Sequence, residues 1–150
     1  MTNDINIEDI NIPGNISGFG YELIRDDLLN DLLGKDQHDI LYWAGKMIAR
    51  KYPLATFEEI IEFFERAGWG TLTVEEEKKQ EVHLTLSSEL ITYRNEHKKN
   101  VSYQLEAGFL AMQIEQQIDV IAETYEEQSK RGHKVKFQVK WDLKDPITKK

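Results

Sequence analysis

Cysteine is absent from the 150 residues of this chain. Its absence excludes disulfides, thiolate zinc sites, iron–sulfur clusters and cysteine nucleophiles. Long apolar runs are also missing, since none approaches the roughly 20 residues needed to span a bilayer. Nothing resembles a signal peptide, because Thr2 to Asp9 is polar and acidic. The sequence therefore predicts a cytoplasmic protein with no membrane insertion.

Positive charge is scarce: 19 Lys and Arg oppose 27 Asp and Glu, for a net charge of -8. Nucleic-acid binding relies on Lys and Arg to displace phosphate counterions, so we expect no nucleic-acid partner. Hydrophobic residues make up 40% of the chain, enough for one core. A domain of this size buries about 70% of the surface that its unfolded chain exposes.

Recognised catalytic and nucleotide-binding motifs are lacking. Gly18-Phe19-Gly20 has no third glycine and does not follow a strand. The four histidines do not cluster, although a metal or proton role for His38 stays open. Asp26, Asp27 and Asp31 share one helix and are expected to be exposed. We therefore expect no enzyme, catalytic residue, metal or cofactor.

Apolar spacings of three and four predict helices over about 21–33, 37–51 and 56–67. Thr56 has the features of an N-cap, and Gly68 those of a left-handed residue after the third helix. Gly45 is expected to allow close helix contact. The predicted inner face of the first helix is Tyr21, Ile24, Leu28 and Leu32, widened by Leu29 and Leu33. That of the second is Ile40, Ala44, Met47 and Ile48, with Leu41 and Trp43 beside them, and that of the third is Ile60, Ile61, Phe63, Phe64 and Ala67.

Alternating apolar residues predict strands around 72–74, 82–86, 90–93 and 135–141, with a charged turn at 75–79. A long helix is predicted over about 102–131, ended by Gly132. This order indicates an α+β fold, with helices packed on one face of a four-stranded antiparallel sheet. The predicted organisation is a mobile N-terminal arm (1–17), a single α+β domain (18–141) and a C-terminal tail (142–150).

Four short markers occur in order along the chain and carry a family resemblance. They resemble the uncharacterised YslB-type proteins of low-GC Gram-positive bacteria over about Ser17 to Trp141. More distantly, they are similar to the four-vinyl-reductase domain and to the Bet-type subunits of the TRAPP vesicle-tethering complex. The markers are Gly18-Phe19-Gly20-Tyr21, Leu41-Tyr42-Trp43-Ala44-Gly45-Lys46, Ala67-Gly68-Trp69-Gly70 and Glu106-Ala107-Gly108-Phe109-Leu110-Ala111.

The resemblance implies a Bet-like, four-vinyl-reductase-like ligand-binding domain. Its relatives suggest either a small apolar ligand or assembly through helices. Bet-type proteins can carry an acyl chain on a cysteine, which this chain lacks. We therefore expect a non-enzymatic domain that binds a small apolar ligand or acts as an adaptor. The alternative is an assembly protein that docks a partner without a ligand, and in either case a homodimer through the first two helices is expected.

An apolar set at the markers is the candidate ligand pocket, and core packing is the alternative for the same residues. Gly108 is expected to leave room beside the ring of Phe109. The candidate pocket residues are Trp43, Met47, Trp69, Phe109 and Met112, with Tyr42, Lys46 and Arg50 as a polar mouth.

Overall fold

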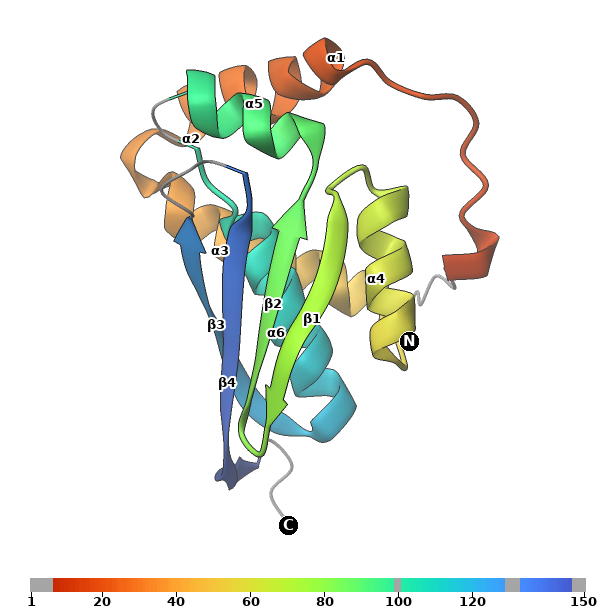
Figure 1. Cartoon of the computed structure of the whole chain (residues 1–150), viewed down its shortest axis with the longest axis vertical. Helices are drawn as coiled ribbons and strands as arrows, with labels where there is room; N and C mark the ends of the chain where they lie inside the picture. Colours follow the sequence, from red (N-terminus) through yellow and green to blue (C-terminus); the bar gives the residue numbers. More distant parts are fainter. Residues whose placement is uncertain (1–6, 99–100, 129–132, 147–150) are drawn as a thin grey trace.

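Two β-hairpins form the sheet of this protein. The computed structural model describes residues 7–98, 101–128 and 133–146. β1 (Thr71–Lys78) and β2 (Glu81–Ser87) make the first hairpin, and β3 (Val120–Gln128) and β4 (Val135–Pro146) make the second. The strands lie in the order β1-β2-β4-β3, and every neighbouring pair is antiparallel (Figure 1). The predicted α+β class with a four-stranded antiparallel sheet is confirmed.

The centre of the sheet follows the predicted alternation of two. Val82, Leu84 and Leu86 of β2 lie opposite the inward-facing residues of β4. All of these side chains are buried, as expected where one face of a strand packs on a core. The opposing β4 residues are Val139, Phe137 and Val135.

Three helices cover one face of this sheet: α3 (Gln37–Lys51), α4 (Phe57–Arg66) and α6 (Gln104–Ile118) (Figure 1). Thr56 caps α4 by accepting a hydrogen bond from the Glu59 N–H at 3.2 Å. Gly68 follows α4 with φ +74°, which confirms the predicted left-handed position. Ile60, Phe63 and Phe64 bury the helix as predicted.

α3 crosses α6 at two glycines. A Cβ at Gly45 would lie 2.0 Å from the carbonyl oxygen of Leu105, and one at Gly108 would lie 1.9 Å from that of Tyr42. This contact selects Gln37, Leu41, Gly45 and Ala49 as the buried side of α3. Of the predicted inner face, Ile48 packs against the core, but Ile40 is exposed, so the predicted centre of that face was wrong. The expected close contact at Gly45 is confirmed.

Residues 18–33 form one nearly continuous helix, here called the N-terminal helix. It comprises α1 (Gly18–Glu22), the wider turns of η2 (Leu23–Leu28) and α2 (Leu29–Leu33). The short η3 (Gly34–Asp36) joins it to α3. Together with α5 (Glu89–His97), the N-terminal helix lies across one end of the sheet (Figure 1).

The predicted strand over Leu90, Ile91 and Tyr93 was wrong, because these residues belong to α5. The Ser88 side chain accepts a hydrogen bond from the Ile91 N–H at 3.0 Å and begins the helix. The buried residues Ile91 and Arg94 are three positions apart, which suits one face of a helix.

The long helix predicted to Arg131 was also wrong, because α6 ends at Ile118. Asp119 takes a left-handed conformation with φ +58°, and β3 begins at the next residue. From there burial alternates, with Val120, Ala122 and Thr124 inside. Residues 129–132, where the helix was predicted to end, lie outside the described residues.

Strand ends also differ from the prediction. The turn expected at 75–79 lies instead after Lys78, because β1 continues through the glutamates with a bulge between Val74 and Glu76. β4 continues past Asp142 to Pro146, which pairs with Val120.

The segment before the N-terminal helix is described from Ile7, in the short η1 (Ile7–Asp9). The Ile7 side chain is buried in the core. The guanidinium of Arg66 on α4 donates to the carbonyl oxygens of Ile7 and Ile10, the latter at 2.8 Å. No helix in the described ranges is both long and apolar enough to cross a bilayer.

The close crossing of α3 and α6 predicts that a Gly→Ala substitution lowers the stability of the protein, which is opposite to its usual effect in a helix. Alanine normally stabilises a helix by about 1 kcal/mol relative to glycine. At Gly108 the added methyl would overlap the Tyr42 backbone, so Gly108→Ala should destabilise the protein by about 1–3 kcal/mol. Urea denaturation measures the change. A Gly108→Ala protein as stable as the parent would contradict this packing.

Candidate functional site

The predicted pocket residues Trp69 and Phe109 lie together in a packed aromatic cluster. Their ring centroids are 5.2 Å apart in an edge-on arrangement. Phe63 stacks on Phe109 at 4.6 Å, and Phe64 meets the Trp69 ring at 5.0 Å. Edge-on and stacked pairs at these distances are the favourable geometries for aromatic rings. The rings thus occupy the space between α4, α6 and the sheet.

The other three predicted pocket residues differ in how deeply they are buried. Met112 is buried in the same core, and Met47 is half-buried. Trp43 is 59% exposed on the outer side of α3 and does not join the cluster. The room expected beside Gly108 is filled by the Tyr42 backbone. Ligand binding at these five residues stays a prediction.

The predicted polar mouth lies along α3 at the free edge of β3. The Tyr42 hydroxyl accepts a hydrogen bond from the Thr124 N–H at 3.1 Å, and Lys46 lies over the Tyr42 ring at 5.2 Å. Burial raises the pKa of Tyr42. Arg50 is exposed. Tyr42 therefore covers a strand edge that would otherwise present an unpaired donor.

The N-terminal helix is rotated about its axis relative to the prediction. Of the stripe expected to be buried, Tyr21, Leu29 and Leu33 are half-buried, but Ile24, Leu28 and Leu32 are 50% to 70% exposed. Phe19 and Leu23 are exposed with them. Glu22, Arg25 and Asp26 are buried instead. We call the exposed set the docking face. It consists of Phe19, Leu23, Ile24, Leu28 and Leu32.

A buried ion pair fixes one turn of this helix to α6. An Arg25 guanidinium nitrogen lies 2.6 Å from Glu106 Oε1, and both side chains are at most 5% exposed. Arg25 also donates to the Tyr21 hydroxyl at 2.8 Å and to the Ser102 carbonyl oxygen at 3.2 Å. Such additional hydrogen bonds are what a buried charge needs to offset its loss of water.

A second buried pair fixes the same helix to α5. Arg94 donates to both carboxylate oxygens of Asp26, at 2.9 Å and 2.7 Å. The Arg94 guanidinium lies 4.9 Å from the centre of the Tyr103 ring, within cation–π range. The Tyr103 hydroxyl donates to Asn95 at 2.8 Å. The expectation that Asp26 is exposed was wrong, because it is the partner of Arg94, whereas Asp27 and Asp31 are exposed as predicted.

The wider turns of η2 let the N-terminal helix expose its apolar residues on one side and bury its charged residues on the other. The Leu29 N–H donates to the Ile24 carbonyl five residues earlier, so this stretch carries an extra residue per turn. Leu23 and Leu28, five positions apart, can then share the outer face, while adjacent Arg25 and Asp26 both point inward. Wide turns of this kind often occur at functional sites.

Electrostatics keeps the buried cluster in one protonation state. Burial lowers the pKa of Arg25, but the charge and hydrogen bond of Glu106, with Tyr21 and Asp26, together raise it more, so its pKa stands above the ordinary value. Burial also raises the pKa of Tyr21 and of Tyr103. Arg25 is therefore charged and both tyrosines are neutral at physiological pH, which suits a structural rather than a proton-transfer role.

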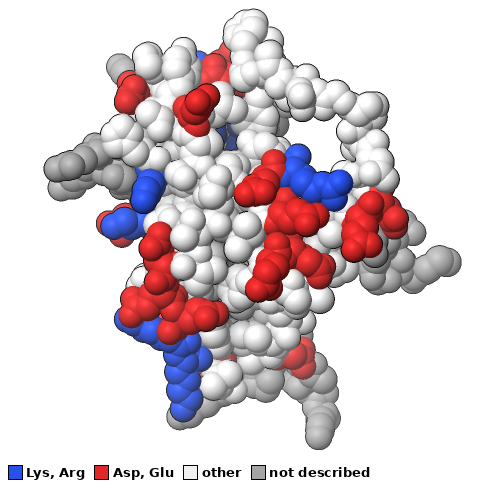
Figure 2. All heavy atoms as spheres, turned by 45° about the vertical axis from the view of Figure 1, so that its right-hand side comes forward, with Lys and Arg blue, Asp and Glu red and all other residues white. Residues whose placement is uncertain are grey.

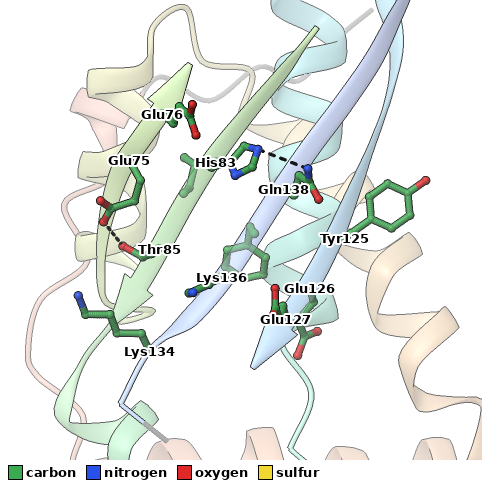
Figure 3. Close-up of a pocket in the computed structure, with 12 residues that line it drawn as sticks. Glu75, Glu76, His83, Thr85, Tyr125, Glu126, Glu127, Lys134, Lys136 and Gln138 are labelled. Atoms are coloured by element: carbon green, nitrogen blue, oxygen red, sulfur yellow. Dashed lines mark hydrogen bonds between the residues drawn. The ribbon is translucent and has the colours of Figure 1, made fainter. Parts of the chain in front are cut away.

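The other face of the sheet carries a hollow of about 750 Å³ lined by polar side chains from all four strands (Figure 3). Glu81 accepts hydrogen bonds from Gln138 at 2.5 Å and His83 at 2.8 Å. The bond from Gln138, followed by that from His83, lowers the pKa of Glu81. Lys134 and Lys136 stand in the same hollow as Glu126 and Glu127 (Figure 3).

The positions of His38 and His83 do not support a metal site. His38 lies 3.1 Å from the Ser102 hydroxyl, and His83 points outward from β2 as predicted. Within the described part of the chain, no three His, Cys, Asp or Glu side chains are placed to hold a metal ion.

Comparison with known proteins gives a family and a fold. The family model described as "Protein of unknown function (DUF2507)" matches residues 18–140. The chain is 51% identical over 132 residues to "Uncharacterized protein YslB" of Bacillus subtilis (strain 168), covering 88% of this chain and 89% of that protein. The predicted resemblance to YslB-type proteins is confirmed.

Two solved structures share the fold. A vinyl-4-reductase family protein from Methanocaldococcus jannaschii matches with a TM-score of 0.60 and 19% identity, covering 87% of this chain and 84% of that one. A mutant Fe(II) unliganded H-NOX protein from K. algicida matches with a TM-score of 0.53 and 18% identity, covering 86% and 75%. At these identities the likeness shows the fold alone, and it confirms the distant similarity to the four-vinyl-reductase domain. The similarity to Bet-type subunits stays a prediction.

Sequence reasoning missed the four charged residues of the two buried pairs: Arg25, Asp26, Arg94 and Glu106. One signal was present, since Glu106 lies inside a marker that is otherwise apolar and small. The paired residues lie 68 and 81 positions apart in the sequence, so no local sequence pattern identifies them as partners. Only the folded structure shows that they meet.

The ion pair between Arg25 and Glu106 predicts that removing one charge costs much more stability than removing both. Arg25→Met leaves Glu106 buried without its cation and should cost about 3–5 kcal/mol of stability. Arg25→Met combined with Glu106→Leu removes both charges and should recover most of that loss. Urea denaturation of the four proteins of this cycle measures the coupling. Additive losses would show that the pair does not hold the helix as described.

Proposed function

Because the chain belongs to the DUF2507 family, described only as of unknown function, we propose a function from its surface. The protein is a non-enzymatic, cytoplasmic adaptor that assembles as a homodimer through the docking face. The observation that carries this proposal is the inverted N-terminal helix, with charged residues buried and apolar residues exposed. Large exposed apolar patches mark interaction sites.

The energy at stake supports an intermolecular role. Fully burying an aliphatic or aromatic side chain is worth about 1.5–3 kcal/mol. The five residues of the docking face are already about half-buried, so a partner could gain about 4–8 kcal/mol from covering them. Two copies together would gain about 8–16 kcal/mol, which is comparable with the about 4–15 kcal/mol that association costs. The docking face is therefore a substantial part of an interface.

A second copy suits the face because an apolar stripe is complementary to itself. A two-fold dimer places the same patch on both partners, and leucine packs on leucine without needing an opposite charge. Asp27 and Asp31 are exposed on the same helix, and each copy carries a net charge of -8. Repulsion between copies should fall as salt screens these charges, so moderate salt should strengthen the dimer.

The ligand-binding alternative has less support. The rings of Trp69 and Phe109 contact each other and Phe63, which favours a packed core at that place. The large hollow lies on the opposite, polar face of the sheet. Catalysis has no converging nucleophile and base among the described residues to support it.

The dimer has a matched test, because Leu28 and Leu143 are equally exposed, at 50% and 49%. Leu28→Asp places a charge in the docking face and should yield a monomer that melts at nearly the temperature of the parent diluted to its own monomeric state. Leu143→Asp on β4 should remain dimeric. Sedimentation velocity over a concentration series measures both. A parent protein that is monomeric throughout the series would refute the proposal.

A further inference from the structure

The segment between Ile10 and the N-terminal helix stands away from the body of the protein. All seven residues from Asn11 to Ser17, here called the strap, are exposed. The strap arches from α1 towards α4 (Figure 1), and an open window remains between it and the body (Figure 2). Ile12 is 83% exposed and Ile16 is 68% exposed. The strap thus presents apolar side chains to solvent next to the docking face.

Both ends of the strap are firmly held. At the first end, Ile7 is buried in the core and Arg66 donates to the carbonyl oxygens of Ile7 and Ile10. At the second, the Ser17 hydroxyl caps α1 by accepting from the Gly20 N–H at 3.0 Å. Between them, Pro13 restricts φ and Gly14 takes φ +91°. The strap is therefore fixed at its ends and shaped by its own turn.

The docking face needs additional surface beside it. A helix of residues 18–33 is about 24 Å long and about 11 Å across, so its outer half presents about 400 Å² of surface. Each partner of a standard stable interface contributes about 800 Å² of accessible surface. The helix alone falls well short of that area. The strap carries two exposed isoleucines and leads through Gly18 to Phe19 of the docking face.

The strap is long enough to cross over a helix. Seven extended residues span up to about 23 Å, which exceeds the roughly 10–12 Å diameter of a helix with its side chains. We infer that the strap is the second half of the docking surface, and that it closes over a helix of the second copy while Ile7 stays anchored on its own chain. In a two-fold dimer each copy embraces the other, so the contact is made twice.

This inference rests on the proposed homodimer, and its test separates the two. Ile12→Asp alters a side chain that the folded monomer does not bury, so the melting temperature should equal that of the parent at dilutions where both are monomeric. The dimer dissociation constant should rise about tenfold or more, because each dimer loses two buried isoleucines. Ile121→Asp on β3, where the parent side chain is 45% exposed, is the matched control and should change it less than about twofold.

A second variant tests the anchor. Arg66→Ala removes the donors to Ile7 and Ile10, so the strap should lose its fixed position and the dimer should weaken in the same direction. Sedimentation velocity measures all variants against the parent. A dimeric parent with unchanged affinity in both Ile12→Asp and Arg66→Ala would refute the strap and leave the homodimer intact. A monomeric parent would refute both.

Discussion

Two buried ion pairs decide which side of the N-terminal helix faces water. Arg25 pairs with Glu106 of α6, and Asp26 pairs bidentately with Arg94 of α5. Moving charges out of water is costly, and each pair repays that cost only in one geometry. The helix is therefore held in a single rotation about its axis. An apolar alternative, with the leucines turned inward, would leave four charges without their partners.

The outward apolar face follows from that constraint. Once Arg25 and Asp26 point inward, Leu28 and Leu32 must point outward, and the wide turn of η2 brings Leu23 onto the same side. Exposure of these residues is a cost to the monomer that binding to another surface removes. In the proposed homodimer, the hydrophobic gain comes from covering this face, and the buried charges orient the helix that makes the contact.

Much of the fold could be predicted from the sequence, because local patterns report local structure. The Thr56 cap, the left-handed Gly68 and the alternation of Val82, Leu84 and Leu86 each need only a few neighbouring residues. Periodicity gave a wrong prediction where the same apolar spacing fits both a helix and a strand. This happened around Asp119, where α6 changes directly to β3. It also cannot tell inside from outside: the stripe on the N-terminal helix was real, but charge partners distant in sequence turned it outward.

The absence of cysteine makes cross-linking the most direct measurement of the central claim. Single cysteines at Phe19, Leu23, Leu28 and Leu32 would each be the only thiol in the chain. Disulfides form only where the Cβ atoms approach to about 3.5–4.5 Å, as happens near a two-fold axis. If the docking face pairs with itself, at least one of these variants should form a covalent dimer far faster than Glu65→Cys, at an exposed position of α4. Equally slow cross-linking at all five positions would contradict the account.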